Sequence, residues 1–556
     1  MNKEKENIVN IFCTIITFFY LLSTFLSLIQ FSFFKKVNGF PLIITFSSLI
    51  ILSLKKILFK QFYIESENFK YFLLSLTLYF FVLFMYLYAF PFFPLIFSQD
   101  FIIHLENGKY LISGEYDIKS LPNNPAIAFL FSNFFSLGLN NLLATSRLLI
   151  TFIHWSAIPF VYNITLKICG KNKTAFIASL TYSLLNPFYH FTLVQTGLYS
   201  NALGITVSLI FFYWFIDSIF FNSIKKNILV FLLGILLLVS HSTNIIIFFV
   251  SLLSSLYLKF LEKSNISLRP IIFLYITPLV VLIIKPELIL RLPSTLESPF
   301  TLIEIGGDFV SEALNIIPYL KYIYRISAIG LFLFITCTII SVYYLFRKRI
   351  GLFSFFFFWI ITIFGISFFS TNAWRFALLS FTPLCMLSIL FYDKILAPTY
   401  YFVSAKFNSY SFKKLLKYES IILLVIILLL FGPFEPYKII NTSFWSREQQ
   451  YGFYECLIWF KYNSENDAYV ISIGGHPMYF LPVVANRNFL GRFEGKPPEY
   501  AYDVLKNYSS GYVVVWNRLH PYNGSFYYVN LYKNSSLFRE VWSNSEVTVF
   551  KLVKKE

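Results

Sequence analysis

The residues best able to do chemistry stand in a short polar stretch, SQDFIIHLENGKYLISGEYD, at 98–117 between long apolar runs. Asp100, His104, Glu106 and Lys109 fall within ten residues of one another. A carboxylate can act as a general base or, together with an imidazole, hold a divalent cation such as Mg²⁺ or Mn²⁺, and an ammonium group can stabilise a phosphate. Each ionised side chain would cost about 2.5 to 3.5 kcal/mol at the centre of a bilayer, so this stretch is not predicted to cross a membrane.

The element that must position these residues is predicted to be a helix on a membrane surface. In a helix, Asp100, His104 and Asn107 share one face at i, i+4 and i+7, while Ile102 and Leu105 belong to an apolar flank. That pattern is typical of an interfacial helix. Prolines in the flanking segments bound the stretch on both sides.

The composition indicates a polytopic α-helical membrane protein. Hydrophobic residues make up 57% of the 556 residues, charged residues make up 13%, and the mean hydropathy is +0.66. Five cysteines, four of them in or beside apolar runs, do not form the framework of a disulfide-rich secreted protein. The net charge of +17 does not indicate a nucleic-acid partner, because the cations fall in short loops between apolar segments.

About 20 apolar residues cross a bilayer, and by this rule the chain contains about thirteen transmembrane helices. The predicted spans are 8–34, 38–54, 71–90, 143–167, 174–188, 199–218, 227–241, 244–259, 270–285, 322–345, 350–369, 376–392 and 418–434. We therefore expect a transmembrane domain at 1–434.

Lysine and arginine gather in alternate connections, which the positive-inside rule assigns to the cytoplasm. The opposite connections then lie outside, and they include a first large loop at 91–142 and a second at 286–321. Lys35 and Lys36 disagree with this assignment, so the orientation of the first hairpin stays open. The apolar segment 126–139 is predicted to be a half-inserted or surface helix of the first large loop, because a full crossing would reverse the spans that follow it.

From residue 435 onward the composition changes, and a small extracytoplasmic α/β domain is predicted at 435–556. The runs DAYVISIG, GYVVVW and EVTVFKLV indicate strands, whereas REQQYGFYECLIWFKYN and PEYAYDVLKNY indicate helices. Four Asn-x-Ser/Thr sequences in this part are in keeping with a location outside the cytoplasm.

The segment TSRLLITFIHWSAIPFVYNITLKICGKNKTAFIASLTYSLLNPF resembles the GT-C superfamily of membrane glycosyltransferases. Arg147 stands where those enzymes have an arginine at the start of a span, Lys171 and Lys173 form the basic turn, and Pro187 ends the next span. The resemblance implies a GT-C-type membrane domain in the cell membrane. It also implies transfer of a hexosyl or pentosyl group from a polyprenyl-phosphate-linked donor to a glycan, lipid or protein acceptor on the extracytoplasmic side. The Trp-Trp-Asp motif of the oligosaccharyltransferase branch is absent, which argues against transfer to asparagine of proteins.

The resemblance and the residue types together suggest roles for the outer-loop residues. Asp100 is the candidate base or, with His104, the candidate cation ligand; the identity of any metal stays open. Arg375, Arg147 and Lys109 are candidates to face the phosphate. Further candidates to line the substrate site are Glu106, His190 and His241.

Structural roles compete with each of these assignments. Asp100 could cap the surface helix, His104 could be a polar residue of the interface, and Arg375 could anchor a span at headgroup depth. The function also has alternatives. A transporter or flippase of a lipid-linked or polar substrate would place ionisable residues near the bilayer midplane. A non-catalytic relative would instead use its outer domain to bind glycans or partner proteins.

Overall fold

The structure is a computed structural model of the 556-residue chain. The residues that it describes are 6–58, 62–63, 69–77, 79–80, 99–114, 124–137, 142–185, 199–221, 223–284, 328–367, 373–396, 398–399, 447–473, 478, 480–493, 495–517 and 527–553. The predicted second outer loop at 286–321 and the last predicted span at 418–434 lie outside these residues.

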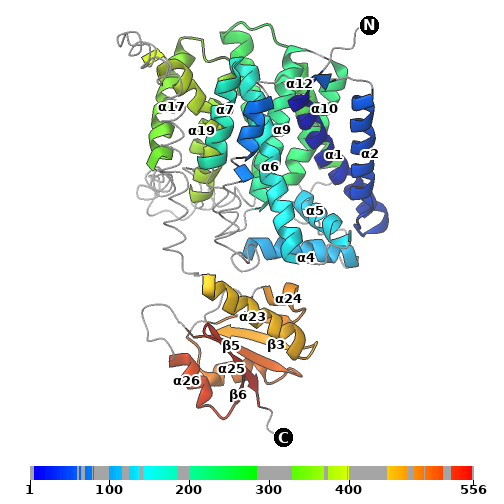
Figure 1. Cartoon of the computed structure of the whole chain (residues 1–556), viewed down its shortest axis with the longest axis vertical. Helices are drawn as coiled ribbons and strands as arrows, with labels where there is room; N and C mark the ends of the chain where they lie inside the picture. Colours follow the sequence, from blue (N-terminus) through cyan, green and yellow to red (C-terminus); the bar gives the residue numbers. More distant parts are fainter. Residues whose placement is uncertain are drawn as a thin grey trace.

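A bundle of helices forms the larger part of the molecule, here called the helical body (Figure 1). Its helices are α1 (Ile8–Phe34), α2 (Phe40–Leu58), α4 (Gln99–Ser113), α5 (Pro125–Ser136), α6 (Leu142–Cys169), α7 (Asn172–Leu185), α9 (Tyr199–Phe220), α10 (Ile224–Ser240), α11 (Ile245–Leu256), α12 (Arg269–Ile284), α17 (Ala328–Phe346), α18 (Ser354–Ser367) and α19 (Ala373–Phe391). Short turns η3 (Ser242–Asn244), η4 (Tyr257–Leu261), η5 (Gly351–Phe353) and η6 (Tyr392–Leu396) join or extend them, and β1 (Glu6–Asn7) pairs with β2 (Phe62–Tyr63).

Three described helices are long and apolar enough to cross a membrane: Ile8–Phe34, Thr145–Cys169 and Tyr199–Phe220. Shorter apolar helices, such as Arg269–Val281 and Gly351–Ser367, also fall within predicted spans. The mostly helical architecture is therefore confirmed, whereas the number of about thirteen spans stays a prediction.

The polar stretch forms the predicted helix α4, and α4 packs against α5 at the end of the body that faces the C-terminal sheet (Figure 1). We call this end the near end and the opposite one the far end. Gly108 permits the close approach, because a Cβ at this position would lie 3.0 Å from Cβ of Phe131. The turn after α1 joins the same layer through a hydrogen bond from the Val37 N–H to the Leu111 carbonyl, at 2.9 Å.

The location of α4 corrects one part of the interfacial-helix prediction. His104, expected on a polar face, is buried together with Leu105. The reason is that a second helix covers α4: the segment predicted to enter the membrane without crossing is α5, whose residues are buried from Pro125 to Phe134.

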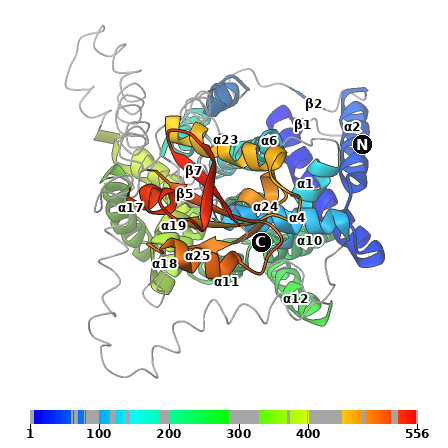
Figure 2. The same cartoon turned by 90° about the horizontal axis from the view of Figure 1, so that it is seen from below.

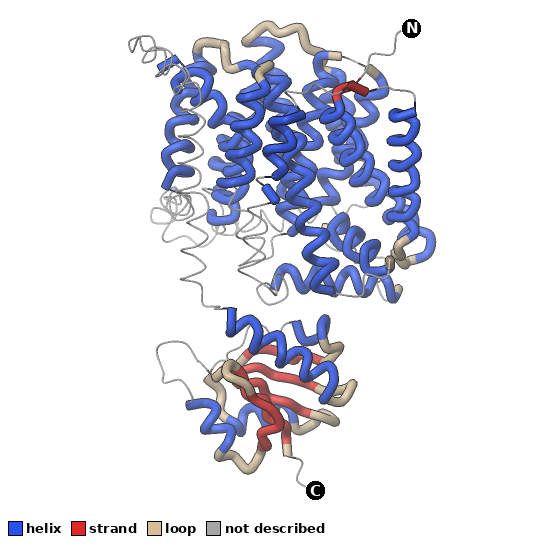
Figure 3. The backbone as a smooth tube through the Cα atoms, viewed as in Figure 1, coloured by secondary structure: helices blue, strands red, loops and turns tan. Residues whose placement is uncertain are grey.

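The described residues from 447 to 553 form a sheet with helices on both faces, here called the sheet unit (Figure 3). Its elements are α23 (Arg447–Asn463), β3 (Tyr469–Ile473), α24 (Leu481–Val484), β4 (Asn488–Arg492), α25 (Pro498–Leu505), β5 (Gly511–Trp516), α26 (Tyr527–Lys533), β6 (Phe538–Ser543) and β7 (Val547–Leu552). The strand order is β4-β3-β5-β7-β6; β3 is parallel to β4 and β5, while β7 is antiparallel to β5 and β6.

The three strands and two helices predicted from the C-terminal sequence are confirmed as β3, β5, β7, α23 and α25. Side chains alternate between the two faces of the sheet, as strand geometry requires. Val513 and Val515 pack with α25 and α26, whereas Val514 and Trp516 pack on the face that α23 covers.

One continuous set of buried apolar side chains joins the helical body to the sheet unit. It includes Leu105 of α4, Phe480 and Leu481 at the start of α24, and Phe453 of α23. Seen along the long axis, α23 crosses the region of α6, and α24 lies over α4 (Figure 2). The fold therefore sets α23 and α24 against the near end of the body.

Candidate functional site

Charged side chains from α4 and α23 meet at the near end. Glu106 and Lys109 stand one helical turn apart on α4, both half-buried, and the ammonium group of Lys109 also lies within electrostatic range of Lys461 on α23. Burial lowers the pKa of Lys109, the Glu106 carboxylate opposes this shift, and Lys461 adds to it. Burial raises the pKa of Glu106, and Lys109 opposes that shift. The ionised forms of both groups are therefore costly here, so a charged ligand would change their balance.

The guanidinium of Arg147 belongs to the same region. Arg147 lies in the second turn of α6, is half-buried, and interacts electrostatically with the phenols of Tyr451 and Tyr454 on α23. Burial raises the pKa of Tyr454, so its hydroxyl stays protonated at neutral pH and can donate a hydrogen bond. We call Glu106, Lys109, Arg147, Tyr451, Tyr454 and Lys461 the near-end cluster. It consists of two groups along α23, because Tyr451 and Tyr454 precede Lys461 by ten and seven residues, about 15 and 10 Å of helix.

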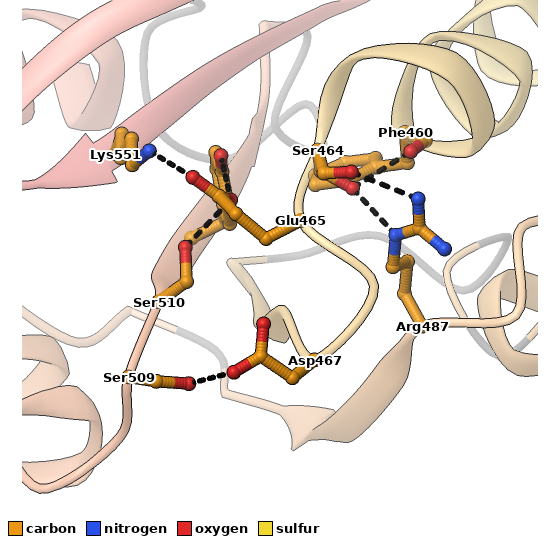
Figure 4. A network of polar contacts seen from close by, with 9 residues as sticks. Phe460, Ser464, Glu465, Asp467, Arg487, Ser509, Ser510 and Lys551 are labelled. Carbon is orange, nitrogen blue, oxygen red and sulfur yellow. Dashed lines mark hydrogen bonds and ion pairs between the residues drawn. The ribbon is translucent and has the colours of Figure 1, made fainter.

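Arg487 fixes the end of α23 from which Lys461 projects (Figure 4). Its buried guanidinium donates to the Lys461 and Ser464 carbonyls at 3.2 and 2.8 Å, and to the Ala485 carbonyl, just after α24, at 2.9 Å. The guanidinium is planar and rigid, and because it donates to several carbonyls at once it links α23 to α24. Because α24 contacts α4, this tie also sets the position of Lys461 relative to the body.

Glu465 forms a second anchor beyond the end of α23 (Figure 4). Its carboxylate accepts hydrogen bonds from Tyr512 at 2.6 Å and Ser510 at 2.7 Å, and pairs with Lys551. Burial opposes ionisation, but the hydrogen bonds from Lys551, Tyr512 and Ser510 outweigh it and lower the pKa of Glu465 to about 2. The carboxylate thus holds the chain after α23 against β5 and β7.

Asp100 and His104, the predicted catalytic pair, both lie on α4. His104 is 8% exposed, and within the described part of the chain its Nδ1 has no hydrogen-bond partner. Burial lowers the pKa of His104 to about 4, so the imidazole is neutral at pH 7. Asp100 belongs to the first turn of the helix, and its side chain lies outside the described residues.

Of the other predicted site residues, the structure describes the side chain of His241. His241 ends α10, and its Nδ1 lies 2.7 Å from Oγ1 of Thr243 and accepts from the Thr243 N–H at 3.2 Å. Its Cβ would lie 2.9 Å from a Cβ at Gly204, so it also packs closely on α9. These contacts give His241 a role in the turn between α10 and α11. Arg375 lies in α19, but its side chain is outside the described residues, as is all of His190.

A divalent cation finds no ready ligand set in the described part of the chain, where no three His, Cys, Asp or Glu side chains gather. The carboxylate of the near-end cluster, Glu106, stands beside Lys109, whose ammonium group would repel a divalent cation at that carboxylate. Metal binding therefore stays an untested expectation for Asp100 and His104.

The sequence pointed to Glu106, Lys109 and Arg147, but not to Tyr451, Tyr454 and Lys461. A signal for these three exists, because Tyr451, Tyr454 and Lys461 recur at helical spacing, on a stripe of α23 beside the apolar Phe453 and Leu457. That periodicity could have marked an outward-facing stripe. It could not have told which part of the body the stripe faces.

Comparisons with known proteins show which solved structures the chain is similar to. No family model and no curated protein matches the chain. The crystal structure of ArnT from Cupriavidus metallidurans bound to undecaprenyl phosphate superposes with a TM-score of 0.51 at 10% identity, over 86% of this chain and 98% of that one. The cryo-EM structure of the arabinofuranosyltransferase AftD from Mycobacteria gives a TM-score of 0.45 at 13% identity, over 88% of this chain and 42% of that one. At such low identity the likeness to ArnT concerns the fold, and the likeness to AftD carries no further argument.

Proposed function

Because the chain has the GT-C fold that its sequence resembles, we propose that it is a membrane glycosyltransferase that uses a polyprenyl-phosphate-linked sugar. The observation that carries this proposal is the near-end cluster on a fold shared with a protein bound to undecaprenyl phosphate. In this proposal the near end and the sheet unit face the extracytoplasmic side. The transferred group is a hexosyl or pentosyl group, and the acceptor is a glycan, lipid or protein.

The proposed reaction breaks the bond between the anomeric carbon and the phosphate oxygen of the donor. An acceptor hydroxyl forms the new bond to that carbon and gives its proton to a base, which we assign to Asp100 on α4. The carrier leaves as a polyprenyl phosphate or diphosphate, which takes the bonding electron pair as negative charge.

Stabilisation of that departing charge falls to the cations of the near end. Arg147 can bind two phosphate oxygens at once, and Lys109 can supply a point charge. Arg375, at the start of α19, is a further candidate for this role. His104, one helical turn after Asp100, is assigned as a neutral positioning residue for that carboxylate.

Transfer in proteoliposomes tests the proposal. With a fluorescent polyprenyl-phosphate sugar as donor, Asp100→Asn should abolish transfer, because the amide cannot take the proton. Asp503→Asn is the matched control, since Asp503 is exposed on α25 and pairs with Lys506. Wild-type activity in Asp100→Asn, in protein that unfolds at the wild-type temperature, would remove Asp100 from the reaction. If the wild-type protein moves the intact donor across the bilayer without cleaving it, the protein is a flippase and the proposal fails.

A further inference from the structure

The turn between α1 and α2 presents aromatic and basic side chains together. Phe33, Phe34 and Phe40 are 78%, 72% and 58% exposed, and Lys35 and Lys36, between them in the sequence, are exposed as well. We call these five residues the basic-aromatic turn. Apolar rings beside ammonium groups suit a membrane interface, because the rings enter the acyl region while the ammonium groups stay among the headgroups.

The length of α1 sets the depth of this turn in a membrane. Ile8–Phe34 is apolar enough to cross a bilayer and has 27 residues, which is about 40 Å of helix. The hydrocarbon core of a bilayer is about 30 Å thick, and the core together with its headgroup regions is about 40 to 45 Å thick. The end of α1 therefore reaches the headgroup layer, and the basic-aromatic turn lies there.

Hydrogen bonds hold the turn in one shape. Lys35 ends α1 in the left-handed conformation, at φ 56°, and its N–H donates to the Phe31 carbonyl at 2.8 Å. Gln30 and Asn38 close the turn through two bonds, from the Asn38 N–H to Oε1 of Gln30 at 3.1 Å and from Nε2 of Gln30 to Oδ1 of Asn38 at 2.6 Å. The same Oδ1 accepts from the Phe40 N–H at 3.0 Å. A backbone fixed in this way loses little entropy when its outward side chains bind a partner.

The turn belongs to the near end, beside the last residues of α4. Val37 is buried, and its N–H donates to the Leu111 carbonyl at 2.9 Å. A Cβ at Gly114 would collide with Cε of Lys36, so the aliphatic stem of this lysine crosses the end of α4. Seen along the long axis, α2 stands at the edge of the body and to the side of the sheet unit (Figure 2). The sheet unit therefore leaves the turn open to lipid.

Two lysines at this end are not explained by the topology or by the reaction. Under the proposed function the near end is extracytoplasmic, where the positive-inside rule does not place cations. The helix dipoles favour Lys35 at the end of α1 and Lys36 beside the end of α4, but they do not account for the exposed rings. Asp100 stands in the first turn of α4 and Gly114 follows its last, about 20 Å away. A phosphate at Lys36 is therefore not the one that transfer at Asp100 would release.

We propose that the basic-aromatic turn binds anionic phospholipids of the leaflet at the near end. Phe33, Phe34 and Phe40 enter the upper acyl region, and Lys35 and Lys36 contact the headgroup phosphates. The partner is an anionic diacyl phospholipid such as phosphatidylglycerol, which supplies both the apolar chains and the negative charge. This lipid site is separate from the donor site and goes beyond the proposed function.

Quenching by brominated lipids tests the proposal. Phe34→Trp places an indole in the turn, and its fluorescence above that of the wild-type protein is followed in vesicles of phosphatidylcholine that contain brominated phosphatidylglycerol or brominated phosphatidylcholine. The anionic lipid should be preferred about fivefold, the size expected for one lysine at a charged membrane surface. In the same background, Lys35→Asn with Lys36→Gln should bring the preference close to one. Asn tolerates the left-handed conformation, and Gln keeps part of the lysine stem.

The matched control is Lys506→Gln with Lys533→Gln, which removes the same charge from the sheet unit, where each lysine pairs with a carboxylate. It should leave the preference unchanged. A preference near one with Lys35 and Lys36 present, an equal preference without them, or no quenching by either lipid would overturn the proposal. A lower unfolding temperature without a change in lipid preference would reduce both lysines to helix caps. No sugar is transferred in this measurement, so a failure of the proposed transferase would leave the lipid site standing.

Discussion

Lysines at the two ends of the helical body differ in which part of the molecule surrounds them. At the far end, Nζ of Lys167 lies 2.7 Å from Oδ1 of Asp217 and 3.5 Å from the ring centroid of Tyr213, and it donates to the Tyr213 carbonyl at 3.3 Å. At the near end, Lys109 has Glu106 on its own helix but also faces the like charge of Lys461. Each lysine thus has a carboxylate and a second cation within electrostatic range, and the difference is that the cation near Lys167, Lys226, belongs to the same body, whereas the one near Lys109, Lys461, belongs to the sheet unit.

This difference distinguishes a lysine held within one body from a lysine at the boundary of two units, which the proposed function assigns to the donor phosphate. A lysine with a carboxylate and an aromatic ring on neighbouring turns gains its stabilisation within the protein. Lysines brought together by the docking of two units lose stability there, and such placements are characteristic of functional sites. Substitutions at the far end are therefore expected to change stability, whereas substitutions at the near end are expected to change ligand binding.

The largest effect on stability is expected at the far end. Lys167→Met should lower the free energy of unfolding by about 2 to 3 kcal/mol, because it leaves the Asp217 carboxylate without its cation in a partly buried place. Thermal unfolding in detergent measures this, and adding Asp217→Leu should restore most of the loss. Arg147→Gln should instead leave stability within about 0.5 kcal/mol and reduce transfer about 100-fold. A destabilised Arg147→Gln with intact transfer would reverse the comparison.

The next largest effect concerns Arg487, whose hydrogen bonds link α23 to α24. Arg487→Ala should lower the free energy of unfolding of the sheet unit by about 2 kcal/mol, because the carbonyls after α23 and α24 lose a buried donor. Arg487→Lys is the conservative control and should recover part of this, since an ammonium cannot reproduce the fork. Intrinsic fluorescence during denaturation follows the change. Unchanged stability in Arg487→Ala would contradict this role of the guanidinium.

His104 sharpens the comparison because it lies at the near end yet is buried. His104→Leu should raise stability by about 1 kcal/mol, since an apolar side chain replaces a buried ring nitrogen that has no partner among the described residues. Transfer should still fall about tenfold if the imidazole positions Asp100. His104→Asn, which keeps a polar group, should restore part of the activity and none of the stability. Full transfer by His104→Leu would reduce His104 to a packing residue.

Glu106 is the negative member of the near-end cluster, so its removal should favour an anion. Under the proposed function, Glu106→Gln should tighten binding of inorganic pyrophosphate, a soluble analogue of the donor phosphate, about three- to fivefold, which is the size expected for one partly exposed like charge. Titration followed by thermal shift measures it, with the exposed Glu499→Gln of α25 as the matched control. Weaker binding in Glu106→Gln would mean that the carboxylate contacts the ligand.

The smallest effect is a pH dependence from the anchor at Glu465. A carboxyl whose pKa is lower in the folded state stabilises the fold above its unfolded pKa, near 4.5, and loses this contribution as the pH falls toward its folded pKa, about 2. Stability of the sheet unit should therefore decline between about pH 4.5 and pH 2. In Glu465→Gln the decline in this window should be shallower. An identical decline in both proteins would assign the acid sensitivity to other groups.

Local sequence patterns predicted much of this fold. The run 447–463 has apolar residues at helical spacing and forms α23, and the β-branched run 511–516 forms β5. The pattern was weaker in β4, where NFLGR contains a glycine at φ 143°, and in β6, where half of the residues are exposed; neither strand was predicted. Short edge strands of this kind form because neighbouring strands pair with them, which local propensity does not encode.

Of the candidate site, only the residues that belong to the helical body were predictable from the sequence. Charges in an apolar chain are conspicuous, so Glu106, Lys109 and Arg147 could be identified from residue type alone. Lys461 and Tyr454 lie more than 300 positions later in a chain segment where polar residues are common. Their relevance comes from the docking of α24 on α4, a long-range contact between short helices that no local pattern indicates. His104 was placed on a polar face for the same reason, because α5 covers it.

The buried apolar contacts that run from Leu105 through Phe480 and Leu481 into the sheet unit have a consequence for expressing parts of the protein separately. A fragment that begins near α23 would expose the apolar surface that packs on α4. A body without the sheet unit would expose the apolar surface of α4. Each part should therefore aggregate when it is expressed alone. Motions that swing the two halves apart should be rare for the same reason. Under the proposed function, a lipid-linked donor would then have to reach the near end without separation of the two units.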